Sequence, residues 1–174
     1  EQWTSWGTMP PGKLNGKVRQ VGLNFGAPGD RVTESGTLWL DYPSVGGPSP
    51  DLPIKVSPEK ITYRYHHSLR VEGGQGWPWI AASLAEGIDT IRINGLTKGK
   101  YLLRLTFLEP DQVKPGGRVF DVMHKGKKLL SKYDVAKAAG GSMRAKTESF
   151  SGLALENSLV LKLRPIRGKT ILSG

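Results

Sequence analysis

Alternating apolar residues between positions 101 and 133 constrain the fold more than any other feature of the sequence. Every second residue from 101 to 107 is large and apolar, and the residues between them are mixed in polarity. A period of two predicts a strand with one buried face and one partly solvated face. Phe120 and Val122 resume the alternation, and residues 127–130 continue it after a break. The stretch therefore predicts three successive strands.

Turn-forming residues separate these three strands. Prolines and glycines between positions 110 and 117 end the first ladder and predict a loop. Lys125-Gly126 has the spacing of a tight hairpin, with Gly at a position of positive φ. Residues 133–140 are typical of one or two helical turns, with Asp134 as the N-cap and Gly140 as the C-terminal stop.

The composition agrees with an all-β fold. The 23 glycines and 12 prolines, with a hydrophobic fraction of 37%, favour short strands joined by turns over a helical bundle. A chain of 174 residues can form one domain with a full core. We expect a single β-sandwich over residues 18–174, with one short helix. Residues 1–17 are expected to be a leader that packs on the sandwich through Trp3 and Trp6, in a sequence that starts within a longer protein.

Further short strands are predicted from alternation and from β-branched and aromatic content. They cover residues 18–23, 37–40, 61–67, 80–84, 88–93, 144–155 with an interruption at Gly152, and 159–163. Residues 41–58 contain five prolines and two glycines, which prevent regular structure over most of the segment. A loop of this length in a compact domain is usually functional or disordered, and the aromatic residues beside it favour a functional loop.

Several of these segments resemble the malectin-like family in order and content. The matching motifs are YLLRLTFLE at 101–109, RVFDV at 118–122, KGK at 125–127, YDV at 133–135, LVLKL at 159–163 and KTILSG at 169–174. The resemblance covers the C-terminal half well and the N-terminal half loosely. It implies a galactose-binding-like β-sandwich of jelly-roll type, commonly a carbohydrate-binding or extracellular interaction module.

Residues 23–50 are similar to a segment of bacterial proteins, often from planctomycetes, that carry a quinoprotein-like β-propeller beside a malectin-like domain. This similarity implies an accessory domain in a larger extracytoplasmic protein. In malectin itself, aromatic residues contact glucose from the loop that follows the strand matching residues 101–109. An acidic residue near the final strand helps to bind the glucose. Here the corresponding loop, residues 110–114, has no aromatic residue, and residues 164–168 are basic. The glucose site of malectin is therefore not carried over.

The chain is basic, with a formal net charge of +10. Such a charge favours anionic partners, and an acidic glycan fits it better than neutral glucose. The alternative is an ordinary solvated surface, because the lysines occur in short scattered groups without any nucleic-acid motif. Because such a motif is missing, nucleic acid is not expected as a partner. No apolar run approaches the roughly 20 residues of a membrane-spanning helix, so a membrane is not expected as a partner either. The absence of cysteine excludes disulfides and thiolate metal sites.

Aromatic residues in two Gly/Pro-rich segments are the best candidates for ligand binding. Sugars present C–H faces that stack on exposed aromatic rings, so loop tryptophans suit carbohydrate recognition. The alternative is that Trp79 starts a strand and belongs to the core. For Trp77, the sequence favours neither an exposed binding residue nor a core residue. The full candidate set is Trp39, Tyr42, Tyr65, His66, His67, Arg70, Trp77, Trp79 and Asp111.

The sequence gives little support for a metal site or a catalytic site. Adjacent His66 and His67 could ligate a metal, but no third ligand has a suitable spacing, which favours structural or surface histidines. A glycosidase needs two carboxylates on either side of a sugar, and Glu109, Asp111 and Asp121 are close in sequence. However, the resemblance implies a structural role for Asp121, so no acid/base pair is predicted. The only candidate cofactor is a structural calcium ion, which takes about six to eight oxygen ligands. Its candidate ligands are Asp30, Glu34 and Asp41.

These observations favour a non-catalytic module that binds a polysaccharide or glycan, within a larger bacterial protein of the periplasm or cell exterior. The expected ligand is an acidic polysaccharide or a polysaccharide from plants or algae. The alternative is a structural module that packs against a neighbouring propeller or catalytic domain and binds no sugar. An enzyme is not expected, because no reactive constellation appears.

Overall fold

The computed structural model describes residues 19–44 and 53–174 of the chain. One layer of the fold is a five-stranded sheet in the order β10-β9-β12-β7-β4, with every neighbouring pair antiparallel. Its strands are β4 (Ile54–Ser57), β7 (Thr90–Asn94), β9 (Val119–His124), β10 (Lys127–Tyr133) and β12 (Ser158–Arg167). The predicted hairpin is confirmed, because Lys125 and Gly126 both have positive φ and link β9 to β10.

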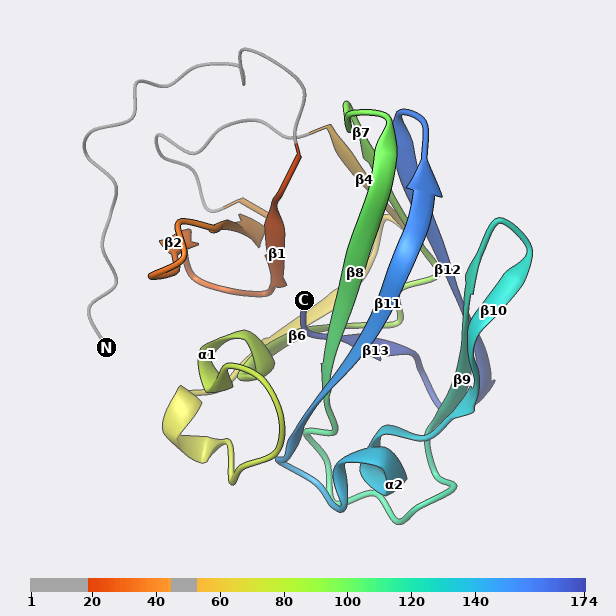
Figure 1. The fold of residues 1–174 in the computed structure, drawn as a ribbon. Coiled ribbons are helices and arrows are strands. Elements are labelled where there is room, and N and C mark those ends of the chain that lie inside the picture. Colours follow the sequence, from red (N-terminus) through yellow and green to blue (C-terminus); the bar gives the residue numbers. More distant parts are fainter. Residues whose placement is uncertain (1–18, 45–52) are drawn as a thin grey trace.

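The facing layer contains two smaller sheets that meet at the C-terminal residues (Figure 1). One pairs β8 (Gly99–Leu108) with β11 (Ala145–Leu155), and the other has the order β13-β6-β5, with β5 (Thr62–Tyr65), β6 (Ser83–Glu86) and β13 (Ile171–Leu172). The Thr106 N–H donates to Gly174 O at 2.7 Å, which joins the two sheets. The predicted interruption of β11 is confirmed, because Gly152 has positive φ within a register shift.

The core lies between these two layers. The five residues predicted from the alternating pattern to be inside are all buried: Phe107, Phe120, Val122, Leu161 and Leu163. Residues 102 and 104 on the other face of β8 are exposed, as the period of two requires. An all-β sandwich is therefore confirmed.

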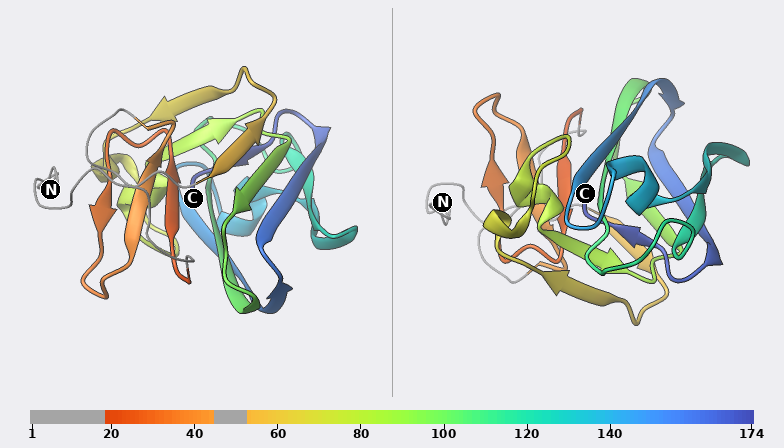
Figure 2. Two further views of the ribbon diagram at one scale, coloured as in Figure 1. Left: turned by 90° about the horizontal axis from the view of Figure 1, so that it is seen from above. Right: turned by 90° about the horizontal axis from the view of Figure 1, so that it is seen from below.

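A third sheet lies to one side of the sandwich (Figure 2). It has the order β1-β3-β2, with β1 (Gly22–Phe25), β2 (Arg31–Val32) and β3 (Leu38–Tyr42). β1 and β3 are parallel, whereas β2 and β3 are antiparallel. The Phe25 N–H donates to Ser173 O at 2.8 Å, so the C-terminal residues lie between this sheet and β8.

The helices differ from the prediction in number. The predicted one, α2 (Val135–Ala139), is confirmed with its Asp134 N-cap and its left-handed Gly140. A second helix, α1 (Pro78–Ala81), and a 3-10 turn, η1 (Ser68–Arg70), were missed. The expected strand at 80–84 is therefore wrong in its first half. Its short apolar run cannot distinguish strand from helix, and Pro78 at the first helical position favours the helix.

The segment 41–58, expected to be irregular, contains the end of β3 and all of β4. The proposed leader at residues 1–17 lies outside the described residues and stays a prediction. No helix in the described ranges is long and apolar enough to cross a membrane.

Candidate functional site

Three tryptophans from different parts of the chain form one cluster, hereafter the tryptophan cluster. Trp39 is on β3, whereas Trp77 and Trp79 flank the first residue of α1. Trp39 meets the other two edge to face, at centroid distances of 6.0 Å to Trp77 and 5.6 Å to Trp79. The rings of Trp77 and Trp79 stack at 5.7 Å with an interplanar angle of 17°. Such contacts are typical of aromatic pairs that stabilise each other.

Local backbone chemistry fixes the position of each ring. A Cβ atom at Gly22 would lie 2.0 Å from Cδ2 of Trp39, so only glycine lets this ring lie on β1. Pro78 begins α1 between the other two tryptophans and fixes the turn of the chain there. The cluster therefore depends on a glycine and a proline that carry no binding chemistry themselves.

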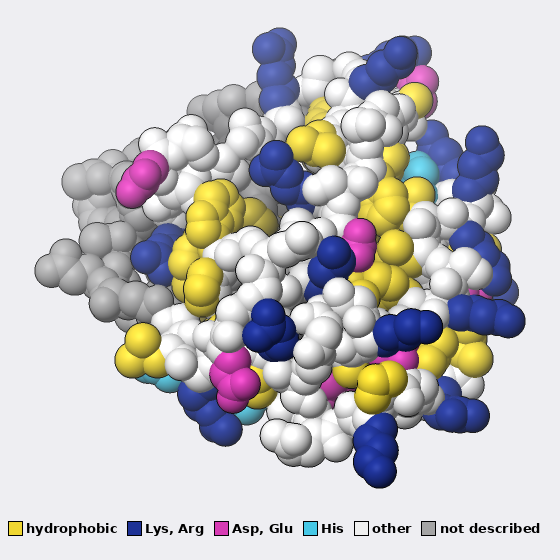
Figure 3. Space-filling model, turned by 60° about the horizontal axis from the view of Figure 1, so that its bottom comes forward, with side chains coloured by type: hydrophobic (Ala, Val, Ile, Leu, Met, Phe, Trp, Pro, Cys, Tyr) yellow, Lys and Arg dark blue, Asp and Glu magenta, His cyan; other side chains and the backbone are white. Residues whose placement is uncertain are grey.

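The cluster has an inner and an outer member. Trp79 is half-buried and lies under the Arg31 guanidinium, whose Cζ is 4.7 Å from the ring centroid, a cation–π contact. Trp77 is 43% exposed. The expectation that Trp79 starts a strand is wrong, since it lies in α1, but its role as a packing residue is supported. Figure 3 shows exposed hydrophobic side chains beside Lys and Arg side chains on one face of the molecule.

A cleft of about 750 Å³ opens beside the cluster, between β1 and β8. Trp39 and Trp77 contribute to one wall, and leucines of β8 and of the sandwich core form the opposite wall and the floor. Arg19, Lys98, Lys100 and Arg104 also line it, and among these only Lys98 has a carboxylate partner within the described residues, Glu156 at 2.8 Å. The mouth of the cleft is therefore basic and its interior is apolar.

Tyr42 does not join the tryptophan cluster. It is three residues from Trp39 on the same strand, so the period of two places it on the opposite face. Its ring lies 5.8 Å from Phe25 and 6.4 Å from Tyr63, and burial raises its pKa. This position makes Tyr42 a packing residue.

Four other predicted binding residues lie at the end of β5, in η1 and between these two elements, and η1 contacts α1. Tyr65, His67 and Arg70 are exposed. His67 caps η1, because its Nδ1 accepts from the Leu69 N–H at 3.2 Å. Burial lowers the pKa of His66, and the nearby charges of Arg70 and Arg64 lower it further. Both histidines therefore have structural surroundings, and no group of three or more His, Asp or Glu side chains in the described ranges could hold a metal ion.

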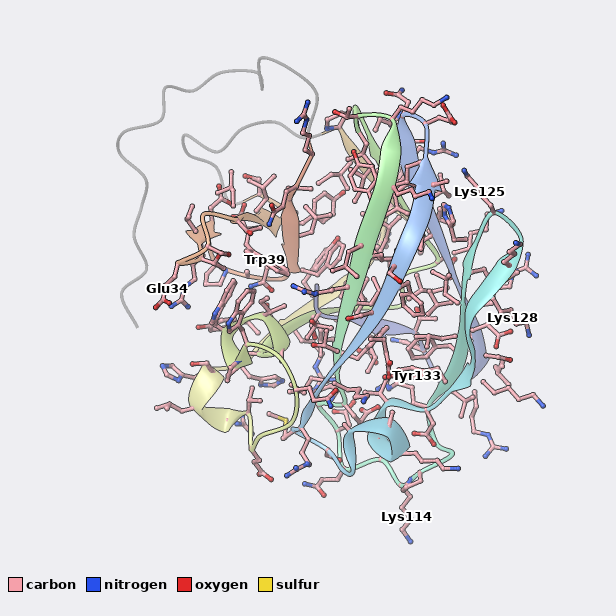
Figure 4. All side chains as sticks on the ribbon, in the orientation of Figure 1. Glu34, Trp39, Lys114, Lys125, Lys128 and Tyr133 are labelled. Atoms are coloured by element: carbon pink, nitrogen blue, oxygen red, sulfur yellow. The ribbon has the colours of Figure 1, made fainter. Side chains whose placement is uncertain are left out.

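Asp30 and Asp41 are neighbours, but the three proposed calcium ligands do not form a metal-binding group among the described residues. Asp30 Oδ1 accepts from the Asp41 N–H at 2.8 Å, so this carboxylate binds backbone. Glu34 is exposed and points away from the neighbouring side chains (Figure 4). The described residues thus give Asp30 and Glu34 the ordinary roles of turn residues.

Sequence reasoning missed a charge cluster at the edge of the sandwich. Arg118 is buried and donates to Glu109 at 2.7 Å, to Glu86 at 3.1 Å and to Asp111 at 3.1 Å. Arg64 holds Asp111 in a two-bond pair, each bond 2.9 Å long. Burial opposes the charge of Arg118, but the hydrogen bonds and charges of Glu109 and Glu86 outweigh it and raise the pKa. Arg118 belongs to the RVFDV motif, so the sequence could single out this residue. The sequence could not show which carboxylates it pairs with, because they come from other strands and loops.

This charge cluster gives the neighbouring carboxylates structural partners. Glu109 is completely buried against Arg118, and Asp111 is bonded by two guanidinium groups. Asp121 accepts from the Lys132 N–H at 2.7 Å and pairs with Lys128 at 2.6 Å. The structural role expected for Asp121 is confirmed, and Asp111 is a structural residue as well.

The Arg64–Asp111 pair predicts a specific dependence of stability on pH. The hydrogen bonds from Arg64 hold the pKa of Asp111 below its ordinary value of 3.8. Because the folded pKa is the lower one, the contribution of the pair is complete above pH 3.8 and is lost as pH falls through the folded pKa. Urea unfolding at pH 7 and pH 3 should therefore show a smaller difference between wild type and Asp111→Asn at the lower pH. An equal difference at both values would contradict this role.

Comparison with known proteins agrees with the fold and with part of the sequence. Residues 91–170 match the family model described as "Malectin domain", which is less than half of the chain. No curated protein sequence matches the chain.

Solved structures share the fold at low sequence identity. A β-glucuronidase of Bacteroides uniformis has a TM-score of 0.64 at 15% identity, covering 87% of this chain and 17% of that protein. The ANXUR2 extracellular domain of Arabidopsis thaliana has a TM-score of 0.66 at 15% identity, covering 87% of this chain and 46% of that one. The chain thus spans only a fraction of each of these proteins. It has their sandwich fold and resembles the Malectin domain family over residues 91–170.

Proposed function

We propose that this chain is a non-catalytic carbohydrate-binding module whose ligand is an acidic glycan that stacks on Trp77. The observation that carries the proposal is the tryptophan cluster, with an outer ring that is 43% exposed and an inner ring held by Arg31. An aromatic ring fixed on a rigid scaffold can receive the C–H face of a sugar with little loss of conformational entropy.

The charge of the surrounding surface supports the acidic character of the ligand. Lys100 and Arg104 lie at the mouth of the adjacent cleft, without a carboxylate partner among the described residues. The whole chain has a formal net charge of +10. Guanidinium and ammonium groups bind carboxylate or sulfate groups through charge-assisted hydrogen bonds, which would orient a sugar that stacking alone leaves free to turn.

The wider setting belongs to the same proposal. The similar structures are segments of longer proteins, since this chain covers 17% of the glucuronidase and 46% of the plant ectodomain. We infer that this chain is likewise an accessory domain of a larger bacterial protein, located in the periplasm or outside the cell. The resemblance of residues 23–50 to proteins with a quinoprotein-like β-propeller supports a propeller as its neighbour.

A second candidate function is a structural module that packs against that neighbour. Leu69 on η1 is 87% exposed, and η1 contacts α1, which carries the tryptophans. An exposed apolar surface of this kind also fits a protein interface. In that case Trp77 would be covered by protein and no sugar would bind.

Trp77→Ala, with Trp79→Ala as the matched variant, separates the two candidates. The glycan is first identified on an array that includes sulfated and uronic-acid polymers, and affinities are then measured by calorimetry. Trp77→Ala should weaken binding about tenfold, because its ring supplies the stacking surface, and it should cost less stability than Trp79→Ala, because Trp77 is 43% exposed. Trp79→Ala should lower the free energy of unfolding by about 1–3 kcal/mol, because it supports Trp39 and Arg31.

Salt gives an independent check of the same site. Affinity for the acidic polymer should fall as salt is added, because exposed charges are screened beyond about 8 Å at physiological ionic strength. A Trp77→Ala variant that loses stability, together with no binding of any acidic glycan by the wild-type chain, would favour the structural module instead.

A further inference from the structure

The five strands of the larger sheet carry almost only positive charge. β4, β7, β9, β10 and β12 together contain eight Lys and Arg residues and one carboxylate, Asp121. The other strands of the described residues are mixed, with five Lys and Arg residues and three Asp and Glu residues. Much of the positive charge of the chain is therefore concentrated on one sheet.

Four of these cations lie together on the outer face of the sheet. The residues that alternate with them pack into or against the core, so the period of two turns four exposed side chains outward: Lys55, Arg92, Lys162 and Arg164. Lys55 lies directly opposite Arg92, and Arg92 lies opposite Val160, two positions before Lys162 on β12. The four cations therefore form one track across β4, β7 and β12, in which neighbouring side chains start about 5–8 Å apart.

This track opposes folding, because like charges directly opposite each other on paired strands are destabilising. A surface that serves only solubility has charges of both signs interspersed. Here the one carboxylate of the sheet is already bonded, since Asp121 pairs with Lys128 at 2.6 Å and accepts from the Lys132 N–H at 2.7 Å. The four cations of the track have no carboxylate partner among the described residues.

The residues outside the described ranges bring little negative charge. Residues 1–18 and 45–52 contain two carboxylates, Glu1 and Asp51. A second copy of the chain would bring another net charge of +10 and would add repulsion. Charge complementarity therefore favours an acidic partner of different sequence.

A hollow of about 210 Å³ adjoins the track beside the β9–β10 hairpin. Met123 and Val160 line it together with the cationic side chains of Lys162 and Arg164. An apolar centre with a polar rim is typical of protein–protein interfaces. The hollow is smaller than a pocket for a drug-sized ligand, about 300–1,000 Å³, and suits one aliphatic side chain.

The face lacks the stacking surface that a sugar or a nucleobase uses. Phe120 and Tyr133 are the only Phe, Tyr or Trp residues of the five strands, and both are buried in the core. Sugars and unpaired bases bind proteins largely through exposed aromatic rings. An acidic polypeptide needs no aromatic platform, so it fits this face better than an acidic glycan.

We propose that the outer face of the five-stranded sheet is a docking surface for an acidic polypeptide, a partner segment with several Asp or Glu side chains around one aliphatic side chain. Its carboxylates pair with the four cations of the track, where Arg92 and Arg164 can each hold a carboxylate by two parallel hydrogen bonds. Its aliphatic side chain fills the hollow beside Met123. This surface is distinct from the tryptophan cluster and does not depend on whether Trp77 binds a glycan.

The test uses the full chain and a capped, fluorescently labelled peptide of Glu and Asp residues around one central Leu. A control peptide has Ser in place of the Leu. Fluorescence anisotropy at physiological ionic strength should show at least about fivefold weaker binding of the Ser peptide, because the hollow then stays empty. Affinity for the Leu peptide should fall as salt is added, because the exposed charges are screened.

Two double variants locate the interaction. Arg92→Glu with Lys162→Glu reverses two charges of the track and should weaken binding of the Leu peptide at least about tenfold. Lys114→Glu with Lys137→Glu changes the net charge by the same amount at exposed residues outside the sheet, and it should keep the affinity within about threefold. The first variant should melt no lower than wild type, because Arg92→Glu places an opposite charge beside Lys55. Should it fail to fold, Arg92→Gln with Lys162→Gln removes the same two charges and is expected to weaken binding in the same direction.

Equal binding of the two peptides, no binding of either, or equal effects of the two double variants would overturn the docking surface. Binding of dextran sulfate or of anionic lipid vesicles that is lost in Arg92→Glu with Lys162→Glu, without binding of either peptide, would overturn the acidic polypeptide as the partner. Peptide binding should persist in Trp77→Ala, and its loss there would place the peptide site elsewhere. A negative result on this face leaves the glycan proposal untouched, because that proposal rests on the tryptophan cluster.

Discussion

Replacing Arg118 with methionine is expected to lower the free energy of unfolding by about 3–5 kcal/mol. Arg118 is buried and is the common partner of Glu86, Glu109 and Asp111. Methionine has a similar length but no charge, so Glu109, which is 0% exposed, would remain buried without its cation. An uncompensated buried carboxylate is far more costly than the loss of an exposed ion pair.

Urea unfolding at pH 7 measures this effect, with Arg92→Met as the control. Arg92 is an exposed residue of β7 without an ion pair among the described residues, so its replacement should change stability little. Adding Glu109→Gln to Arg118→Met should restore part of the loss, because the orphaned charge is then removed. Equal effects of Arg118→Met and Arg92→Met would contradict the assigned role of the charge cluster.

Phe120→Ala is expected to destabilise the protein by a similar amount, about 3–5 kcal/mol. The Phe120 ring is fully buried at 5.9 Å from Phe107 and 6.0 Å from Tyr133, between the two layers of the sandwich. Figure 4 shows Tyr133 at the end of β10, pointing toward β8. Truncation would leave a cavity that a close-packed β core cannot collapse around.

The matched control for Phe120→Ala is Leu102→Ala on β8, because Leu102 is 52% exposed on the outer face. Its replacement should cost well under half as much, since less apolar surface is removed from contact. Thermal and urea unfolding of both variants give the comparison. A small effect at Phe120 would mean that the two layers are not held together at this point.

The sequence predicted the parts of the fold in which local pattern and tertiary environment agree. β8 and β12 have one buried face and one partly solvated face over much of their length, and β9 buries Phe120 and Val122, so alternation identified all three strands. The hairpin at Lys125-Gly126 and the capped helix α2 also follow local rules of turn and cap chemistry. Helix α1 was missed because its four residues are too few to show a helical period.

The candidate site was predicted in part. Trp39, Trp77 and Trp79 do come together, but Tyr42 faces the other side of β3 because three positions separate it from Trp39. Arg31 could not be predicted, because only the pairing of β2 with β3 brings it over Trp79. Contacts between residues far apart in sequence depend on such pairings, which single-residue patterns do not encode.

The most direct test of the proposed function is a nuclear magnetic resonance titration with an oligosaccharide of uronic acids. The indole N–H signals are assigned with the Trp77→Ala and Trp79→Ala variants. We expect the Trp77 signal to shift most, with smaller shifts at Trp79 and Trp39, while amides of the β9–β10 hairpin stay unchanged. Binding that shifts other residues and leaves the Trp77 signal in place, or no binding to any acidic glycan, would contradict a glycan site on the tryptophan cluster.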